Sequence, residues 1–112
     1  MKTLIEILSG IETMDRNGNT FSVPITESTH KEGVEFETEH EVPVPSMEIV
    51  PDGRDNWFNV YARTTEHTEM YQIMEELIMR LRGTNYRFGG TKANLSKAAV
   101  VFCFDVQREN DG

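Results

Sequence analysis

The clearest hydrophobic pattern in the chain lies within residues 56–83. Apolar side chains recur there at intervals of three and four residues, which places a single stripe on a helix of about 3.6 residues per turn. The stripe consists of Met70, Ile73, Met74, Leu77, Ile78 and Leu81. Thr64 or Thr65 is suited to cap the first turn, and Gly83 to follow the last turn in a left-handed conformation. The pattern predicts an amphipathic helix over about residues 65–82, with one face packed on a sheet.

Strand patterns flank this helix on both sides. Along residues 57–63, one face carries Phe58, Val60 and Ala62, and the other carries Trp57, Asn59, Tyr61 and Arg63. Residues 98–106 are apolar on both faces as far as Cys103, which is typical of a central strand covered on both sides. One helix covers only one face of a sheet. The N-terminal segment or another subunit must therefore cover the second face, and Trp57 and Tyr61 would suit a subunit interface.

The N-terminal part of the chain predicts a short helix followed by a hairpin. Residues 3–8 favour a helix that ends near Gly10. Residues 11–14 and 20–25 then flank the dipeptide Asn17-Gly18, which is a strong hairpin signal because both residues tolerate positive φ.

Residues 34–44 alternate almost strictly between apolar and acidic side chains. This period of two predicts a strand with one strongly acidic side. The acidic row consists of Glu35, Glu37, Glu39 and Glu41. Prolines follow at positions 43, 45 and 51. Because proline cannot donate to a strand ladder, we expect residues 43–55 to form an extended connection or a bulged edge.

Together these patterns predict a single α+β domain over residues 1–112. We expect a mainly antiparallel sheet of about four to six strands with one principal helix packed on one face. Residues 85–88 predict a short strand, residues 89–90 a break and residues 92–97 a polar connection. The acidic, proline-containing region 26–55 is expected to be a mobile hairpin or loop within the domain.

Charge and cysteine content narrow the classes of function. The 112-residue chain has 11 Lys and Arg against 19 Asp and Glu, a formal net charge of −8. We therefore expect protein partners and neither nucleic-acid nor membrane binding, because those surfaces attract basic proteins. Cys103 is the only cysteine, which excludes an internal disulfide and fits a reducing compartment. Without a secretion signal or a long apolar segment, we expect a protein made in the cytosol and not secreted.

The residues that often carry chemistry form no catalytic pattern here. Cys103 has no basic neighbour in sequence to lower its pKa, so it reads as a core cysteine and not as a nucleophile. His30, His40 and His67 lack metal-ligand spacing, and we expect them to be exposed or capping residues. The sequence Gly89-Gly90-Thr91-Lys92 lacks the glycine spacing of a phosphate loop and predicts a turn. We expect no catalytic, cofactor or metal site, and no enzymatic activity.

The glutamate row at residues 35–41 is the most distinctive local feature, and it has two interpretations. Alternate residues on a strand lie about 6.6–6.8 Å apart, a spacing comparable to that of successive phosphates in a nucleic-acid strand. Such a row could imitate DNA towards a basic partner or line a passage for DNA. It could equally be an ordinary solvated face that discourages edge-to-edge aggregation.

A family resemblance comes from the C-terminal half. The strand Asn-Val-Tyr-Ala-Arg-Thr at residues 59–64 leads into the helix stripe that ends at Gly83, and the apolar strand 100–106 follows. This order, within residues 56–109, resembles tail terminator and tail completion (neck) proteins of long-tailed bacteriophages. In that group a strand of the type V-x-V-Y-A-x-[ST] runs into a long helix ending in L-x-G, followed by a final apolar strand. The N-terminal half departs from the group, which has a longer first helix.

The resemblance implies a structural subunit of a phage-type particle. Such subunits form an oligomeric ring, commonly a hexamer, at the tail-tube end or neck, and would occur in the host cytoplasm and in the virion. The row of Glu35, Glu37, Glu39 and Glu41 would then face a lumen through which DNA slides. The alternative is a small acidic inhibitor or adaptor that uses the same glutamates to bind a basic partner surface.

Overall fold

The structure is a computed structural model that describes residues 2–27, 45–95 and 100–109. Two helices and seven strands lie in this part of the chain. In chain order they are α1 (Leu4–Leu8), β1 (Glu12–Met14), β2 (Thr20–Ser22), β3 (Ile25–Glu27), β4 (Ser46–Pro51), β5 (Trp57–Thr64), α2 (His67–Leu81), β6 (Tyr86–Leu95) and β7 (Val100–Arg108). Five strands form one sheet in the spatial order β3-β4-β5-β7-β6, and β1 and β2 form a separate hairpin.

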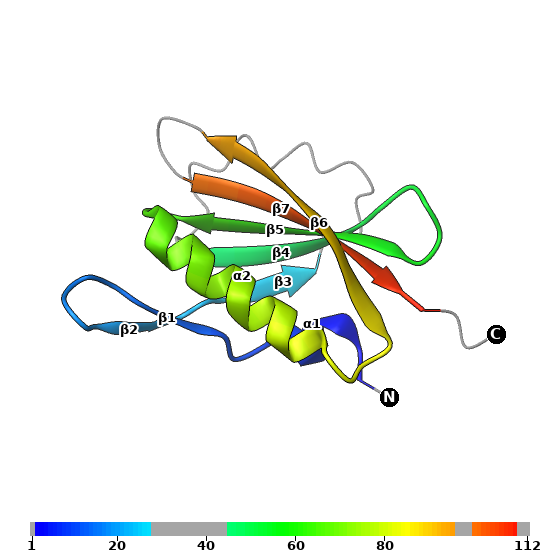
Figure 1. Ribbon diagram of the computed structural model, residues 1–112, viewed down its shortest axis with the longest axis horizontal. Coiled ribbons are helices and arrows are strands. Elements are labelled where there is room, and N and C mark those ends of the chain that lie inside the picture. The colour runs from blue at the N-terminus through cyan, green and yellow to red at the C-terminus, as the bar shows by residue number, and fades with distance from the viewer. Residues whose placement is uncertain (1, 28–44, 96–99, 110–112) are drawn as a thin grey trace.

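Helix α2 lies across one face of the five-stranded sheet, as Figure 1 shows. Neighbouring strands of that sheet are antiparallel, except β3 and β4, which are parallel. The predicted α+β architecture, a mainly antiparallel sheet with a helix on one face, is therefore confirmed.

The apolar side of α2 follows the stripe that predicted the helix. Its buried stripe residues are Met70, Ile73, Leu77 and Leu81, while Met74 and Ile78 are partly buried. The helix begins at His67 and not at residue 65, because Thr64 completes β5 and Glu66 takes the N-cap position. The Thr64 hydroxyl donates to the Glu66 carbonyl oxygen (2.8 Å), so neither predicted threonine is the cap. Gly83 has a φ of 76° just beyond the helix, as expected.

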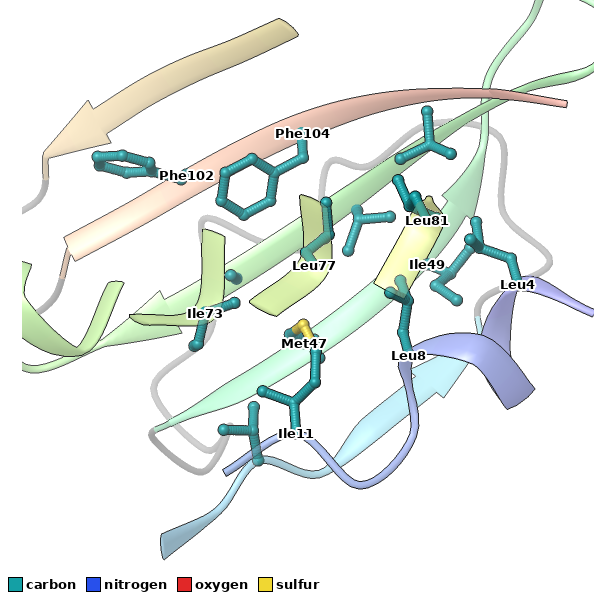
Figure 2. Close-up of a cluster of buried hydrophobic side chains, with 14 of the residues drawn as sticks. Leu4, Leu8, Ile11, Met47, Ile49, Ile73, Leu77, Leu81, Phe102 and Phe104 are labelled. Carbon is teal, nitrogen blue, oxygen red and sulfur yellow. The ribbon is translucent and has the colours of Figure 1, made fainter. Parts of the chain in front are cut away.

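One hydrophobic core joins both helices to the α2 side of the sheet. Figure 2 shows α2 side chains together with those of β4, β7 and α1; the labelled residues are Leu4, Leu8, Ile11, Met47, Ile49, Ile73, Leu77, Leu81, Phe102 and Phe104. Val60 and Ala62 of β5 are fully buried in the same cluster. Because burial of one large apolar side chain contributes about 1.5–3 kcal/mol, this cluster is what holds both helices on the sheet.

Helix α1 forms where the sequence predicts a short N-terminal helix. A capping box begins it, because the Thr3 and Glu6 side chains each accept from the other residue's backbone N–H. Arg80 of α2 donates to backbone carbonyl oxygens at the end of α1 and just beyond it, those of Ile7, Ser9 and Gly10. Helix α1 thus lies beside α2, so the expectation that the N-terminal segment could cover the second face of the sheet is wrong.

Strands β1 and β2 form the predicted hairpin, which projects from the rest of the molecule (Figure 1). At its turn, the Asp15 carboxylate accepts from the backbone N–H groups of Asn17 and Asn19, both at 2.9 Å. The Gln72 side chain of α2 pairs with the backbone of Met14, accepting from its N–H (2.8 Å) and donating to its carbonyl (3.0 Å). The amide of Gln72 therefore anchors β1 to α2.

Strand β4 corrects the expectation that residues 43–55 form a connection or a bulged edge. It is an internal strand that pairs with β3 on one side and with β5 on the other. The prolines do not interrupt it, because Pro45 precedes the strand and Pro51 is its last residue. Met47 and Ile49 on one face and Val50 on the other are all buried, as in a strand covered on both sides.

Strand β6 corrects a second expectation. Residues 86–95 form one strand, in place of a short strand, a break and a polar connection. A bulge at Gly89, where the register shifts between Phe88 and Gly90, lets the ladder continue through the glycine pair. Strand β7 lies between β5 and β6, as predicted for a central strand. Its Cys103, however, is only partly buried and is not part of the α2-side core.

Candidate functional site

Trp57 and Tyr61, two of the predicted interaction residues, lie on the sheet face that points away from α2. Val60 and Ala62 flank Tyr61 in the sequence and belong to the α2-side core. Because side chains alternate along β5, Trp57 and Tyr61 lie on the opposite face. We call this the distal face and define it by Trp57, Asn59 and Tyr61 of β5 and by Cys103, Asp105 and Gln107 of β7, which are cross-strand partners. The other predicted residues, Glu35, Glu37, Glu39 and Glu41, lie outside the described residues.

The Trp57 side chain extends across the distal face from β5 towards β6. A Cβ atom placed on Gly89 of β6 would lie 2.9 Å from Cζ3 of Trp57, so the indole occupies the space above that glycine. The Arg54 guanidinium lies 4.1 Å from the indole ring centroid, in cation–π geometry. Arg54 also pairs with Asp52 at 2.9 Å, and this hydrogen bond lowers the pKa of the Asp52 carboxyl. Trp57 is thus fixed from both sides but stays partly exposed.

Tyr61 and Cys103 form a cross-strand pair in the middle of the distal face. Desolvation is the largest cause of their shifted titration: burial raises the pKa of Tyr61 to about 12 and the pKa of Cys103 to about 11. The negative charge of Asp105 raises both pKa values further, whereas the hydrogen bond with Tyr61 lowers that of Cys103. Both groups are therefore neutral at neutral pH, and the thiol lacks the activation that a nucleophile needs.

Exposure differs between the two ends of this side of the sheet. In the cross-strand row Ser46, Arg63 and Val101, all three residues are buried. In the row that contains Trp57 and Gln107, the side chains are only partly buried. The accessible area of the distal face therefore lies around Trp57, at the end remote from Arg63.

No group of three His, Cys, Asp or Glu among the described residues is placed to hold a metal ion. His67 is exposed in the first turn of α2, as predicted, whereas His30 and His40 lie outside the described residues. An aromatic side chain flanked by a guanidinium and amides, as at Trp57, is typical of a protein-binding surface.

A concave feature that the sequence did not reveal lies between the hairpin and the start of α2. It is a hollow of about 320 Å³ lined by Asp15, Arg16, Asn17, Phe21, Pro45, Thr65, Glu66 and Glu69. The sequence pattern around Phe21 predicts only a strand, and the pattern around Glu69 predicts only the first turn of a helix. The hollow arises because Gln72 holds the hairpin beside α2, a contact between residues 58 positions apart.

Comparison with known protein families and with proteins of curated function finds none that matches this chain. Neither of the two described helices is long and apolar enough to cross a membrane. We therefore base the functional proposal on the geometry and chemistry of the described surfaces and on the resemblance noted in the sequence.

Proposed function

We propose that this protein is a structural assembly subunit that forms an oligomeric ring of the kind found at the tail-tube end or neck of a phage-type particle. Its distal face is the contact surface for a neighbouring protein. In this proposal the protein performs no chemistry, and its function is to join subunits through fixed surfaces.

The observation that carries the proposal is the position of Trp57. A large aromatic side chain lies partly exposed on a flat sheet face, held between Arg54 and Gly89. Tryptophan, tyrosine and arginine are the residues most enriched among those that dominate binding energy at protein interfaces. Because Trp57 is already fixed in the single chain, little side-chain entropy is lost when a partner covers it.

The resemblance to phage tail terminator proteins supports the same proposal. The strand, the helix and the final apolar strand that carry it correspond to β5, α2 and β7. Strands β5 and β7 are neighbours in the sheet, and α2 packs on their core side. The matching residues thus form one unit of structure, and Tyr61 of that unit lies on the distal face.

Substitution of the distal aromatic residues tests the proposal. We expect Trp57→Ala and Tyr61→Ala to weaken self-association at least about 30-fold, since hot-spot residues contribute about 2 kcal/mol or more. Tyr71→Ala is the matched control, because Tyr71 is an exposed tyrosine on α2, away from the distal face. Oligomer mass by light scattering and the melting temperature are measured for each variant. Equal losses of assembly and of monomer stability would show that the face is ordinary core and would contradict the proposal.

The alternative, an acidic inhibitor or adaptor, is favoured by the net charge of −8 and the glutamate row. It requires a basic partner and no self-association. Reversing Glu37 and Glu39 to lysine would abolish binding to such a partner and its salt dependence, but would leave a ring built on the distal face intact.

A further inference from the structure

Glu69 is the most unusual charged residue of the hollow beside the hairpin. Only 6% of its surface is exposed, and among the described residues it makes neither a hydrogen bond nor an ion pair. Its carboxylate oxygens are not among the fully buried, unpaired polar atoms, so they open on the hollow, and their partial burial is unfavourable. Its place in the first turn of α2, near the positive end of the helix dipole, offsets part of that cost. The hollow therefore presents one unpaired negative charge to a partner.

The other charged groups in the hollow are already paired. Glu66 is bound by Arg16 at the rim, and the Asp15 carboxylate accepts from the backbone of its own turn. Phe21, which is 42% exposed, adds an aromatic wall. One unpaired carboxylate beside an aromatic ring suits a guanidinium group, which pairs with carboxylates in a fixed plane and stacks on aromatic faces.

A cation of this kind lies at the far end of α2. Arg82 follows the last residue of the helix, is exposed, and its side chain has no hydrogen bond or ion pair within the described part of the chain. One turn before it, Met79 is 55% exposed. The hollow and this end of α2 therefore each present an exposed apolar residue beside an unpaired charge, and the two charges are of opposite sign.

The two groups cannot meet within one copy of the chain. They are 13 positions apart along a straight helix, which separates them by about 20 Å at about 1.5 Å per residue. The hairpin and the start of α2 lie towards one end of the molecule in Figure 1, and the last turn of α2 lies away from that end. A contact between them must therefore join two copies. When such contacts run head to tail, and not as a reciprocal two-fold pair, they produce rings as the rotation closes.

We infer that the hollow lined by Phe21, Glu66 and Glu69 binds Arg82 of a second copy of this chain. The guanidinium of one copy neutralises Glu69 of the next, and Met79 packs near Phe21. The inference rests on the proposed self-assembly and adds a second, head-to-tail contact to the one made by the distal face.

Glu69→Gln is the most direct variant, because the amide keeps the shape of the side chain and removes its charge. We expect self-association to weaken at least about 30-fold, the effect of losing one partner of a buried charge pair. The melting temperature should stay the same or rise, since a partly buried, unpaired carboxylate is lost from the single chain. Glu75→Gln, an exposed position on the same helix, is the control and should assemble like the wild type.

Mixing two variants tests the head-to-tail direction. With Trp57→Ala in both chains to remove the distal-face contact, Glu69→Gln and Arg82→Ala chains should each be monomeric alone. An equimolar mixture should give one-to-one dimers and no larger species, because Arg82 of the first chain meets the intact Glu69 of the second. Light scattering after size-exclusion chromatography distinguishes these masses.

Three results would overturn the inference. The first is a Glu69→Gln chain that assembles like the wild type, and the second is a mixture that contains no dimers. If Trp57→Ala abolishes assembly while Glu69→Gln does not, the inference fails and the proposed function stands. The third is a wild-type chain that is monomeric throughout, which contradicts the proposed function as well.

Discussion

The pairing of Tyr61 with Cys103 across β5 and β7 determines how both groups titrate. Each gives up a proton less readily in the folded chain than in water, mainly because burial disfavours the charged form. Above about the ordinary thiol pKa of 9.0, the folded state therefore keeps protons on these two groups that the unfolded state loses. Their contribution to stability is fully present below that pH and is lost as the pH rises through about 11 for Cys103 and about 12 for Tyr61.

Alkylation of Cys103 checks this shift. At pH 8 the folded chain should react with iodoacetamide about 100-fold more slowly than the urea-unfolded chain, because a pKa raised by about two units leaves a hundredth of the thiolate. Unfolding midpoints in urea should also fall between pH 8 and pH 11. A folded-state rate equal to that of the unfolded chain would show that Cys103 is not protected on the distal face.

Arg80 is a second side chain whose role is visible only in three dimensions. It donates to carbonyl oxygens around the end of α1 and pairs with Glu76 one turn back on α2 (3.0 Å). It therefore satisfies acceptors that a helix end leaves unpaired.

We expect Arg80→Ala to lower the free energy of unfolding by about 1–3 kcal/mol, because the partly buried Ile7 carbonyl and two exposed carbonyls lose their donor. Arg87→Ala is the control: Arg87 makes one exposed ion pair with Glu109, and such pairs contribute about 0–1 kcal/mol. Urea unfolding of both variants measures the difference. Equal effects would mean that Arg80 does not hold α1 in place.

The bulge in β6 links the shape of an edge strand to the candidate site. At Gly89 the added Cβ atom would meet the Trp57 ring at 2.9 Å and the Asp105 carbonyl oxygen at 3.3 Å, whereas at Gly90 it would meet no atom within 4 Å. Two adjacent glycines thus have different roles, and only the first is needed for the close approach of the indole.

Gly89→Ala should therefore displace Trp57 and lower the free energy of unfolding by about 1–3 kcal/mol, as overpacking does. Gly90→Ala should leave stability unchanged or raise it by up to about 1 kcal/mol. Because Trp57 is the only tryptophan, its fluorescence reports the displacement directly. An unchanged spectrum in Gly89→Ala would place the indole elsewhere.

The elements differ in how well the sequence predicts them. The stripe on α2 and the Asn17-Gly18 hairpin are local signals, and both elements form where expected. Strand β4 was missed because Pro45 and Pro51 read as interruptions, although they lie just outside and at the end of the strand. Strand β6 was predicted only as far as residue 88, because Gly89 suggests a break, and only pairing with β7 shows that it is a bulge.

The candidate sites also divide into those that a local pattern predicts and those that depend on contacts between distant segments. The period of two along β5 is enough to put Trp57 and Tyr61 on the face opposite the core. The hollow around Glu69 depends on the packing of the hairpin beside α2, two segments far apart in sequence, and no local pattern encodes that contact. The predicted roles of Glu35, Glu37, Glu39 and Glu41 stay predictions, because these residues lie outside the described part of the chain.

The distribution of charge over the whole molecule bears on assembly. Each chain carries a net charge of −8, so copies repel one another at low ionic strength. At about 0.15 M salt the screening length is about 8 Å, which weakens this repulsion more than it weakens a buried contact between opposite charges. The Glu69–Arg82 contact and the distal face would then act at short range, where the net charge matters least.

The mass of the wild-type protein in solution tests the account most directly. Size-exclusion chromatography with light scattering, at about 0.15 M salt and over a wide range of protein concentration, should give one species whose mass is an integer multiple of the monomer mass. That multiple should persist on dilution until the subunits dissociate. A single monomeric mass at the highest concentration reached would contradict the proposal that this protein is a self-assembling structural subunit.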